Sequence, residues 1–244
     1  MCEEQVRCAT WNVHRALGTD GRVDAARVVD AISSIFGPLG LDILALQEAD
    51  EECPPHGRIL DVQEIVKRTG LIYAHDDAHL RWGSESSGFL GTVLFLAPSL
   101  ERVHAEVIDL PGHCHRGAVS VEVARGGSRF RVLSMHLSLF QPLRAVQMRV
   151  VGQYLFRRPP MQTIMLGDLN EWRPWGGLMF HEWLVGTRFR GPLRRTFPSH
   201  RPILPLDRIM TDGNGSVRSM RAIQDAEVTL ASDHLPLEAI VTVP

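Results

Sequence analysis

The segment Thr163-Ile-Met-Leu-Gly-Asp-Leu-Asn170 passes directly from an apolar run to a glycine, an aspartate and an asparagine. A short apolar run bounded by turn-forming residues is typical of a buried strand, so we predict a strand over Thr163–Leu166. Ligand sites of α/β proteins gather beyond the ends of such strands, where loops converge. Asp168 and Asn170 are therefore candidate functional residues, although Gly-Asp-Leu-Asn alone could form an ordinary Asx turn.

Further runs rich in Val, Ile and Leu predict additional strands, and the segments between them show the three- and four-residue spacing of amphipathic helices. The helical segments are 23–36, which ends at Gly37-Pro38; 59–66, which ends at Gly70; and 146–155, which Pro159-Pro160 terminates. Alternating strands and helices without an internal repeat or linker favour a single α/β domain over residues 1–244. The additional strands are Val6–Val13, Asp42–Gln47, Leu90–Ala97, Ala118–Val123, Phe130–His136, Asp207–Thr211 and Leu237–Val243.

Polar side chains lie at the ends of several of these strands. Each has an ordinary structural interpretation, such as a turn cap or a solvated strand end, and for a single position that interpretation is the more frequent one. The set as a whole is harder to explain by structure alone, because carboxylates, histidines and asparagines recur together. Besides Asp168 and Asn170, the set comprises Asn12, Glu48, His136, Asp207, Asp233 and His234.

Convergence of these carboxylates would call for a cation. Two carboxylates about 4 Å apart repel each other by about 4 kcal/mol at an effective dielectric near 20, and a divalent ion removes that penalty. Carboxylate and amide oxygens suit Mg²⁺ or Mn²⁺ better than zinc. The histidine pairs that could suggest zinc, His75 with His79 and His113 with His115, lie in loop-like stretches and are interpreted as solvated or substrate-edge residues.

Composition places the chain among ordinary globular proteins. It has 244 residues, 44% of them hydrophobic and 22% charged, with a formal net charge of −2, which argues against disorder. A slightly acidic chain is also unlike a dedicated duplex-binding protein, whose affinity depends on phosphate neutralisation. We find no basic leader followed by an apolar stretch and no run of the ~18 apolar residues that a membrane span requires, so we expect a cytoplasmic protein without a transmembrane segment.

Taken in order, the motifs resemble the endonuclease/exonuclease/phosphatase superfamily of metal-dependent hydrolases, in particular its small bacterial members. The resemblance runs from residue 10 to residue 241, and GDLN with SDHLP after a strand ending in QE is more specific than either motif alone. It implies an α/β four-layer sandwich, with two mixed β-sheets face to face and helices on the outside. The motifs are TWNVHRA, LALQEAD, HRGAVSVEV, LSMHLSL, MLGDLNEW, LPLDRIM and ASDHLPLEAIV.

The resemblance also implies roles for the matched positions. Glu48 is expected to be the principal ligand of Mg²⁺ or Mn²⁺, with Asn12 beside it and Asp233 on the other side of the ion. Asp168 is expected to position or deprotonate the attacking water. Asn170 is expected to donate a hydrogen bond to a non-bridging phosphate oxygen.

Other matched residues complete the implied site. Asp207 and His234 are expected to form a hydrogen-bonded pair in which the carboxylate fixes the imidazole tautomer. His136 and Arg116 match positions that contact the scissile phosphate. One departure is His14, which stands where many abasic-site nucleases have a carboxylate; we assign it to the substrate, and its presence disfavours a nuclease.

The superfamily contains nucleases, sphingomyelinases and small phosphodiesterases, so the implied fold does not select a substrate. Trp172 and Trp175, which precede the arginine-rich stretch 188–201, could face a base or a lipid headgroup or could pack on the sheet, whereas we expect Trp183 to pack. We predict a Mg²⁺-dependent phosphodiesterase for a small or lipid-derived phosphodiester, monomeric and without a stable nucleic-acid complex. The alternatives are an endo- or exonuclease on DNA or RNA, and an inactive interaction module, which the retention of the matched residues disfavours.

Overall fold

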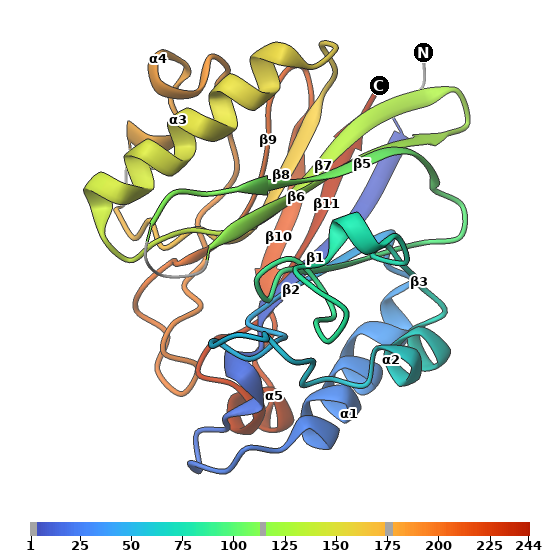
Figure 1. The fold of residues 1–244 in the computed structure, drawn as a ribbon, viewed down its shortest axis with the longest axis vertical. Helices are drawn as coiled ribbons and strands as arrows, with labels where there is room; N and C mark the ends of the chain where they lie inside the picture. Colours follow the sequence, from blue (N-terminus) through green and yellow to red (C-terminus); the bar gives the residue numbers. More distant parts are fainter. Residues whose placement is uncertain (1–3, 113–115, 174–177) are drawn as a thin grey trace.

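Two mixed β-sheets form the centre of the computed structural model, which describes residues 4–112, 116–173 and 178–244 (Figure 1). Each sheet contains one parallel pair, β1 with β2 in the first and β7 with β8 in the second, and its other described pairs are antiparallel. The first sheet has the strand order β10 (Val217–Ala222), β11 (Leu237–Val243), β1 (Glu4–Asn12), β2 (Ile43–Gln47), β4 (Val93–Leu96) and β3 (Ile72–Tyr73). The second has the order β5 (Glu101–Asp109), β6 (Gly117–Arg125), β7 (Ser128–His136), β8 (Thr163–Asp168) and β9 (Asp207–Thr211).

The two sheets pack face to face through a shared apolar core that includes Ile43, Leu94, Val121 and Leu166. Helices cover their outer faces: α1 (Ala25–Phe36), α2 (Val62–Thr69) and α5 (Ala226–Ala231) lie on the first sheet, and α3 (Gln141–Arg157) and α4 (Glu182–Val185) on the second (Figure 1). This arrangement confirms the four-layer sandwich. Short 3-10 turns complete the described elements: η1 (His14–Ala16), η2 (Gly37–Leu39), η3 (Ala78–Leu80) and η4 (Leu178–Phe180).

Helix boundaries follow the capping signals in the sequence. The Asp24 side chain accepts a hydrogen bond from Arg27 N at the start of α1, and Asp61 accepts one from Glu64 N, at 3.0 Å in each case. Gly70 ends α2 in the left-handed conformation, with φ of 72°. Among the described helices, none combines the length and the apolar run needed to cross a bilayer.

Several sequence-based expectations were wrong in detail. The strand expected over 90–97 begins at Val93, because Leu90 and Gly91 form a turn with positive φ. In α3 the buried face is formed by polar residues as well as Met148 and Val151, while Val146 is exposed. The edge strands β5 and β10 were not expected, because both are only partly buried and lack a continuous apolar run.

The burial of Trp183 and of His75 also differs from the expectation. Trp183 is 56% exposed on α4 instead of packing on the sheet. His75 is fully buried: its Nδ1 lies 2.7 Å from Leu80 O, and its Nε2 accepts a 3.0 Å hydrogen bond from Leu94 N. Burial lowers the pKa of His75 to about 4, so it is a neutral structural residue rather than a solvated one.

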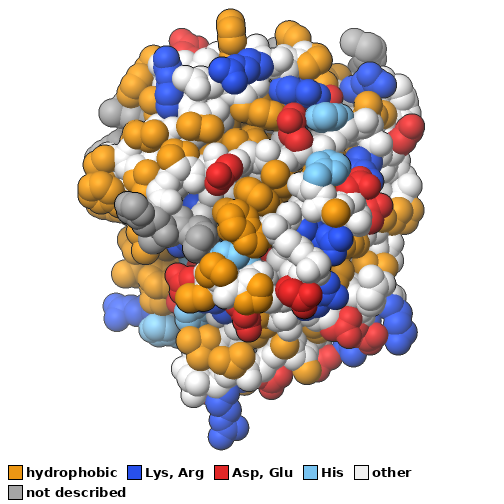
Figure 2. Space-filling model, viewed as in Figure 1, with side chains coloured by type: hydrophobic (Ala, Val, Ile, Leu, Met, Phe, Trp, Pro, Cys, Tyr) orange, Lys and Arg blue, Asp and Glu red, His pale blue; other side chains and the backbone are white. Residues whose placement is uncertain are grey.

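Strand register brings the polar strand ends together. His136 is the partner of Asp168 across β7 and β8, and Asp168 is the partner of Asp207 across β8 and β9. Gly167 makes this approach possible, because a Cβ atom there would lie 1.9 Å from Met135 O, and its φ is +141°. On the face shown in Figure 2, basic and acidic side chains are interspersed among apolar ones.

Candidate functional site

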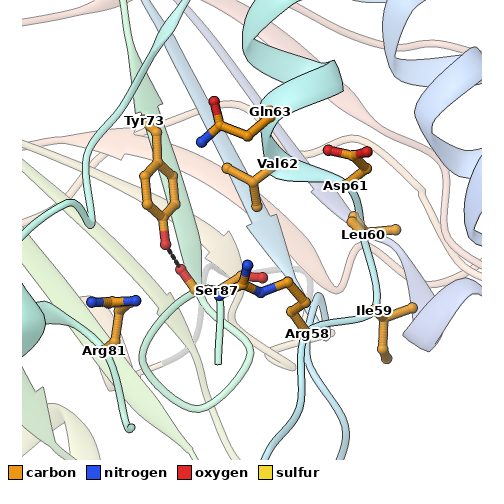
Figure 3. Close-up of a pocket in the computed structure, with 9 residues that line it drawn as sticks. All are labelled: Arg58, Ile59, Leu60, Asp61, Val62, Gln63, Tyr73, Arg81 and Ser87. Atoms are coloured by element: carbon orange, nitrogen blue, oxygen red, sulfur yellow. Dashed lines mark hydrogen bonds between the residues drawn. The ribbon is translucent and has the colours of Figure 1, made fainter. Parts of the chain in front are cut away.

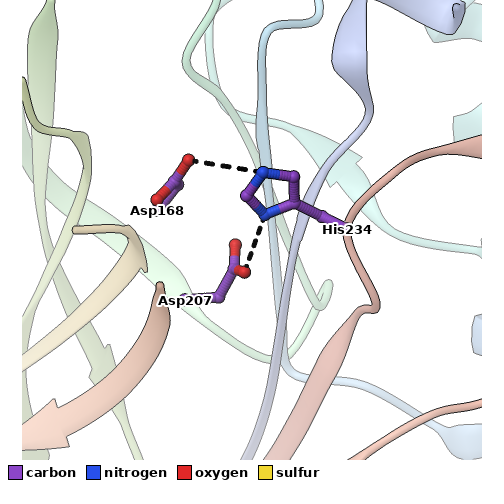
Figure 4. A group of neighbouring side chains, drawn as sticks. All are labelled: Asp168, Asp207 and His234. Atoms are coloured by element: carbon purple, nitrogen blue, oxygen red, sulfur yellow. Dashed lines mark hydrogen bonds and ion pairs between the residues drawn. The ribbon is translucent and has the colours of Figure 1, made fainter. Parts of the chain in front are cut away.

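The expected pair of Asp207 and His234 is present at the edge of the second sheet. His234 Nδ1 lies 2.9 Å from Asp207 Oδ2, and its Nε2 lies 3.9 Å from Asp168 Oδ2, so the imidazole stands between two carboxylates (Figure 4). All three side chains are buried. We call this group, Asp168, Asp207 and His234, the relay.

Within the relay, the positive charge of His234 is balanced by the negative charges of the carboxylates. Although burial opposes a charged imidazole, the Asp207 carboxylate, which also hydrogen-bonds it, and Asp168 raise the pKa of His234 to about 10. Burial raises the pKa of Asp168 to about 6, against the opposing effect of the His234 charge. One ligand atom from each of the three residues lies within 4.8 Å of the others, a spacing also found in metal sites. A protonated His234 has no free lone pair, however, so the relay is better described as a charge-balanced hydrogen-bonded group.

Contacts with the first sheet hold the His234 loop in place. Trp11 Nε1 donates to His234 O at 2.9 Å, and Ser232 Oγ donates to Asn12 O at 2.7 Å while accepting from His234 N at 3.1 Å. These bonds join the loop before β11 to the end of β1, so the imidazole is fixed from both sheets.

Glu48 and Asn12 form the other half of the site, at the ends of the parallel strands β2 and β1. Asn12 Nδ2 donates to Asp168 Oδ2 at 3.0 Å and to Glu48 Oε1 at 3.3 Å, and thereby links the two halves. Glu48 itself has a positive φ of 56°, a conformation rare for a residue with a side chain and frequent at functional positions. The proximity of Glu48, Asn12 and Asp168 agrees with the expected convergence of polar strand ends.

Arg15 is a residue of this half that the sequence did not indicate. Its Nη1 lies 2.6 Å from Glu48 Oε2, although the two groups are not aligned as a hydrogen bond, and its Nη2 lies 3.4 Å from Glu52 Oε2. Arg15 N also donates to Glu48 O at 3.1 Å. His14, Arg15 and Ala16 all have positive φ, so this turn depends on tertiary contacts that no local pattern reveals.

His136 and Arg116 lie beside the carboxylates. His136 Nε2 is 3.4 Å from Asp168 Oδ2 and 3.9 Å from Glu48 Oε1. Burial lowers the pKa of His136 well below its usual value, and the positive charge of Arg116 acts in the same direction. Arg116 lines a small pocket together with Glu48, His136 and Arg15, so two arginines flank the carboxylate-rich site.

Asn170 forms a turn beside Asp168 and keeps part of its side-chain amide free of hydrogen bonds from the described residues. Its backbone N donates to Asp168 Oδ1 at 3.1 Å, which is the Asx turn that the sequence also allowed, and its φ is 52°. Its Nδ2 donates to Leu137 O at 2.9 Å. That amide carries a second hydrogen, which is available to another acceptor.

Asp233 and His14 lie together at the rim. Asp233 Oδ1 is 3.4 Å from His14 Nδ1, which also lies 3.0 Å from Leu17 O. Among the described residues, no hydrogen bond or ion pair joins Asp233 to Glu48 or Asn12. The structure therefore brings Glu48 and Asn12 together directly and Asp233 only into their neighbourhood, through His14, whose N donates to Asn12 Oδ1.

Exposed apolar side chains follow β7 and β8, the strands that end at His136 and Asp168. Trp172 is 50% exposed, with the Arg173 guanidinium 5.4 Å from its ring centroid, whereas Trp175 lies outside the described residues. Leu139 and Phe140, which the sequence did not indicate, are 75% and 66% exposed just after β7. A hydrogen bond from Arg173 to Gln141 joins the two loops. We call Leu139, Phe140 and Trp172 the apolar rim.

A four-layer sandwich with a carboxylate- and histidine-rich site at the edges of its two sheets is an arrangement suited to phosphoester hydrolysis. The chain belongs to the endonuclease/exonuclease/phosphatase family, whose profile matches residues 9–234. Members of this family are generally hydrolases of phosphoester bonds and commonly use divalent metals. The resemblance drawn from the motifs is thereby confirmed.

The chain is also similar to individual proteins over nearly its whole length. The uncharacterized protein YbhP of Escherichia coli K12 is 27% identical over 241 residues, which cover 94% of this chain and 93% of the relative. The fold is similar to that of an endonuclease/exonuclease/phosphatase from Bacteroides vulgatus, with a TM-score of 0.75, 15% identity and coverage of 99% and 100% of the two chains. It is also similar to D. rerio TDP2 complexed with a single-strand DNA product, with a TM-score of 0.71, 19% identity and coverage of 98% and 99%. At these identities the two structures show a shared fold.

Proposed function

We propose that the protein is a Mg²⁺- or Mn²⁺-dependent phosphodiesterase that cleaves a small or lipid-derived phosphodiester, and that residues 1–244 act as a single domain. The observation that carries this proposal is the direct link between the buried relay and Glu48, which Asn12 makes by donating to both Asp168 and Glu48. A general base and a candidate metal ligand thus share one hydrogen-bond donor.

The donor set fits a hard divalent cation. Glu48 and Asn12 offer carboxylate and amide oxygens, and Asp233 Oδ1 is buried without a hydrogen bond from any described residue. We assign Glu48 and Asn12 as ligands, with Asp233 as a ligand or as an orienting group. When bound, Mg²⁺ or Mn²⁺ would lower the pKa of a water molecule and neutralise charge on the phosphate.

The protein side chains have complementary roles in this proposal. Asp168, with its pKa raised to about 6, can accept a proton from the attacking water at neutral pH. His234 is kept cationic by Asp207, so with Arg116 it would stabilise the negative charge that grows on the phosphate oxygens. The second amide hydrogen of Asn170 would bind a non-bridging oxygen, and the neutral His136 would contact the same phosphate.

The apolar rim supports a substrate with an apolar or ring-containing part. Leu139, Phe140 and Trp172 are exposed in the loops that follow His136 and Asp168, and a phosphodiester with an acyl chain or an aromatic group would cover them. The net charge of −2 does not favour a long polyanion. His14 stands where many abasic-site nucleases have a carboxylate, so a second anionic metal ligand is missing at that position, which also disfavours a duplex nuclease.

A second candidate is the end of a DNA strand, because the D. rerio TDP2 structure contains a single-strand DNA product. Purified protein should therefore be assayed with Mg²⁺ against bis(p-nitrophenyl) phosphate, phosphatidylcholine vesicles, a single-stranded oligonucleotide and plasmid DNA. We expect hydrolysis of the small or lipid diester, abolished by a chelator and restored by Mg²⁺ or Mn²⁺. Full activity in excess chelator would refute the mechanism, and efficient, salt-sensitive cutting of DNA alone would replace the proposed substrate with the second candidate.

A further inference from the structure

A second cavity lies away from the relay, at the start of α2. Its volume is about 510 Å³, which is within the range of small-molecule sites, and none of its lining residues lines the pocket of Glu48. Figure 3 shows Arg58 and Arg81 reaching the cavity from separate segments, with Tyr73 and Gln63 also on its wall.

The cavity contains two cationic side chains that form no close ion pair with a described acidic residue, although the charge of Arg58 acts on the neighbouring Asp50. Neither Arg58 nor Arg81 forms an ion pair or a side-chain hydrogen bond with any residue in the described ranges, and Arg81 Nε is buried without an acceptor. Asp61 is the one acidic residue among those lining the cavity, and its Oδ1 already accepts a hydrogen bond from Glu64 N. A guanidinium group presents planar, paired donors that match the oxygens of a phosphate group.

The first turn of α2 contributes to the same wall. Val62 and Gln63 are its first residues, and the first amides of a helix have no carbonyl partner within that helix. The partial positive charge at this helix end adds to that of the two arginines, and the capping carboxylate of Asp61 offsets part of it. Tyr73, whose hydroxyl donates to Ser87 O, closes the cavity with a ring that is only half buried. The cavity therefore offers guanidinium and amide donors at one end and an aromatic face at another.

The cavity also adjoins the segment that carries Glu48. Asp50 accepts hydrogen bonds from Ser87 N at 2.8 Å and Gly88 N at 2.9 Å, and its backbone pairs with Arg58 across an isolated bridge. Asp50 lines the pocket of Glu48 as well. One short segment thus separates the two cavities.

We propose that this cavity is a binding site for a phosphate-bearing small molecule, separate from the catalytic site. Its donors would bind the phosphate group, and Tyr73 would contact the remainder of the ligand. The proposal does not depend on the proposed function, because it requires neither the metal nor turnover.

Calorimetric titration of the full chain in EDTA with inorganic phosphate, pyrophosphate and AMP tests the proposal without the catalytic metal. We expect saturable binding, strongest for the ligands with more than a bare phosphate, and a loss of affinity of about tenfold or more in the Arg58→Gln/Arg81→Gln double variant. Arg157→Gln, which removes the same charge at the end of α3 on the other sheet, should bind as the parent does.

The Arg58→Lys/Arg81→Lys variant keeps both charges and provides a second measurement if the glutamine variant fails to fold. It should bind several-fold more weakly than the parent, because lysine lacks the paired planar donors. Absence of binding at millimolar ligand, or equal binding by the parent and the Arg58/Arg81 variants, would overturn the proposal.

Discussion

The two halves of the candidate site handle charge in different ways. In the relay, His234 lies between Asp207 and Asp168, so the protein supplies both the negative charges and the cation that balances them. In the other half, Glu48 faces Arg15 in an orientation that makes no hydrogen bond, and Asp233 Oδ1 accepts none from the described residues. The relay is complete without a ligand, whereas the Glu48 half retains oxygens that a divalent cation can use. We expect substitutions in the relay to impair the chemical step and substitutions around Glu48 to change metal affinity.

The largest effect is expected for Asp168→Asn, which removes the base while keeping the side-chain shape. Turnover should fall by roughly 10²–10⁴-fold, the range for loss of general-base catalysis, with a much smaller change in substrate affinity. Steady-state kinetics on the preferred diester measures both. Asp212→Asn is a matched control, because Asp212 accepts from Thr163 N at the opposite end of β8 and should affect stability instead. Near-normal turnover of Asp168→Asn would show that Asp168 is only a turn residue.

A smaller effect is expected for each member of the Asp207 and His234 pair. Asp207→Asn and His234→Gln should each lower turnover by about 10²-fold, and the double variant should be little worse, because residues that act as a unit are not additive. NMR titration gives a separate readout. In Asp207→Asn the pKa of His234 should fall from about 10, so that the imidazole loses its proton at a lower pH. If the losses of turnover were additive and the pKa of His234 did not change in Asp207→Asn, the two residues would not act as a unit.

The third-largest effect is expected for Glu48→Gln, which should weaken metal binding. Glu48→Gln removes one negative charge from the expected ligand set, so Mg²⁺ binding measured by calorimetry should weaken by about tenfold or more. The titration of His234 should stay as in the parent, because the relay has its own charge balance. Equal Mg²⁺ affinity in Glu48→Gln and the parent would remove Glu48 from the metal site.

The smallest effect concerns Arg15, whose positive charge competes with a cation for Glu48. Arg15→Gln should tighten Mg²⁺ binding by about two- to fivefold, which corresponds to the modest energy of a partly exposed ion pair. Arg22→Gln, on an exposed loop, is the charge-matched control. Weaker Mg²⁺ binding in Arg15→Gln would instead assign Arg15 to holding Glu48 in position for the metal.

The sequence pattern could place the members of the relay because they lie at or next to the ends of recognisable strands, whereas the pairing of Asp207 with His234 was implied by the family resemblance. The bounds of β9 and β11 agree with the expected strands, so Asp207 and the loop before Leu237 were placed correctly, and the hydrogen bond between Asp207 and His234 is confirmed. Strands buried on both faces leave a continuous apolar run, which is a strong local signal. The four layers were implied by the family resemblance rather than by that signal.

The remaining features depend on contacts between distant segments. Arg15 reaches Glu48 only because three consecutive residues adopt positive φ, and no pattern in HRA indicates this. Exposure of Leu139 and Phe140 is likewise a property of the surrounding loops, since an apolar residue after a strand is more often buried. Edge strands such as β5 are stabilised by the neighbour that they pair with, so a single-strand pattern does not reveal them.

The close approach of Gly167 to β7 limits how far the strands that carry the site can shift. A single methyl group there would meet Met135 O at 1.9 Å, so either β7 or β8 would have to move. The next residues along these strands are His136 and Asp168, so the movement would alter the distance between two groups of the site without changing the charge of either. A larger side chain at position 167 would therefore displace His136 or Asp168, although it removes no polar group from the site. The gap between β7 and β8 at this position is too small for one additional carbon atom.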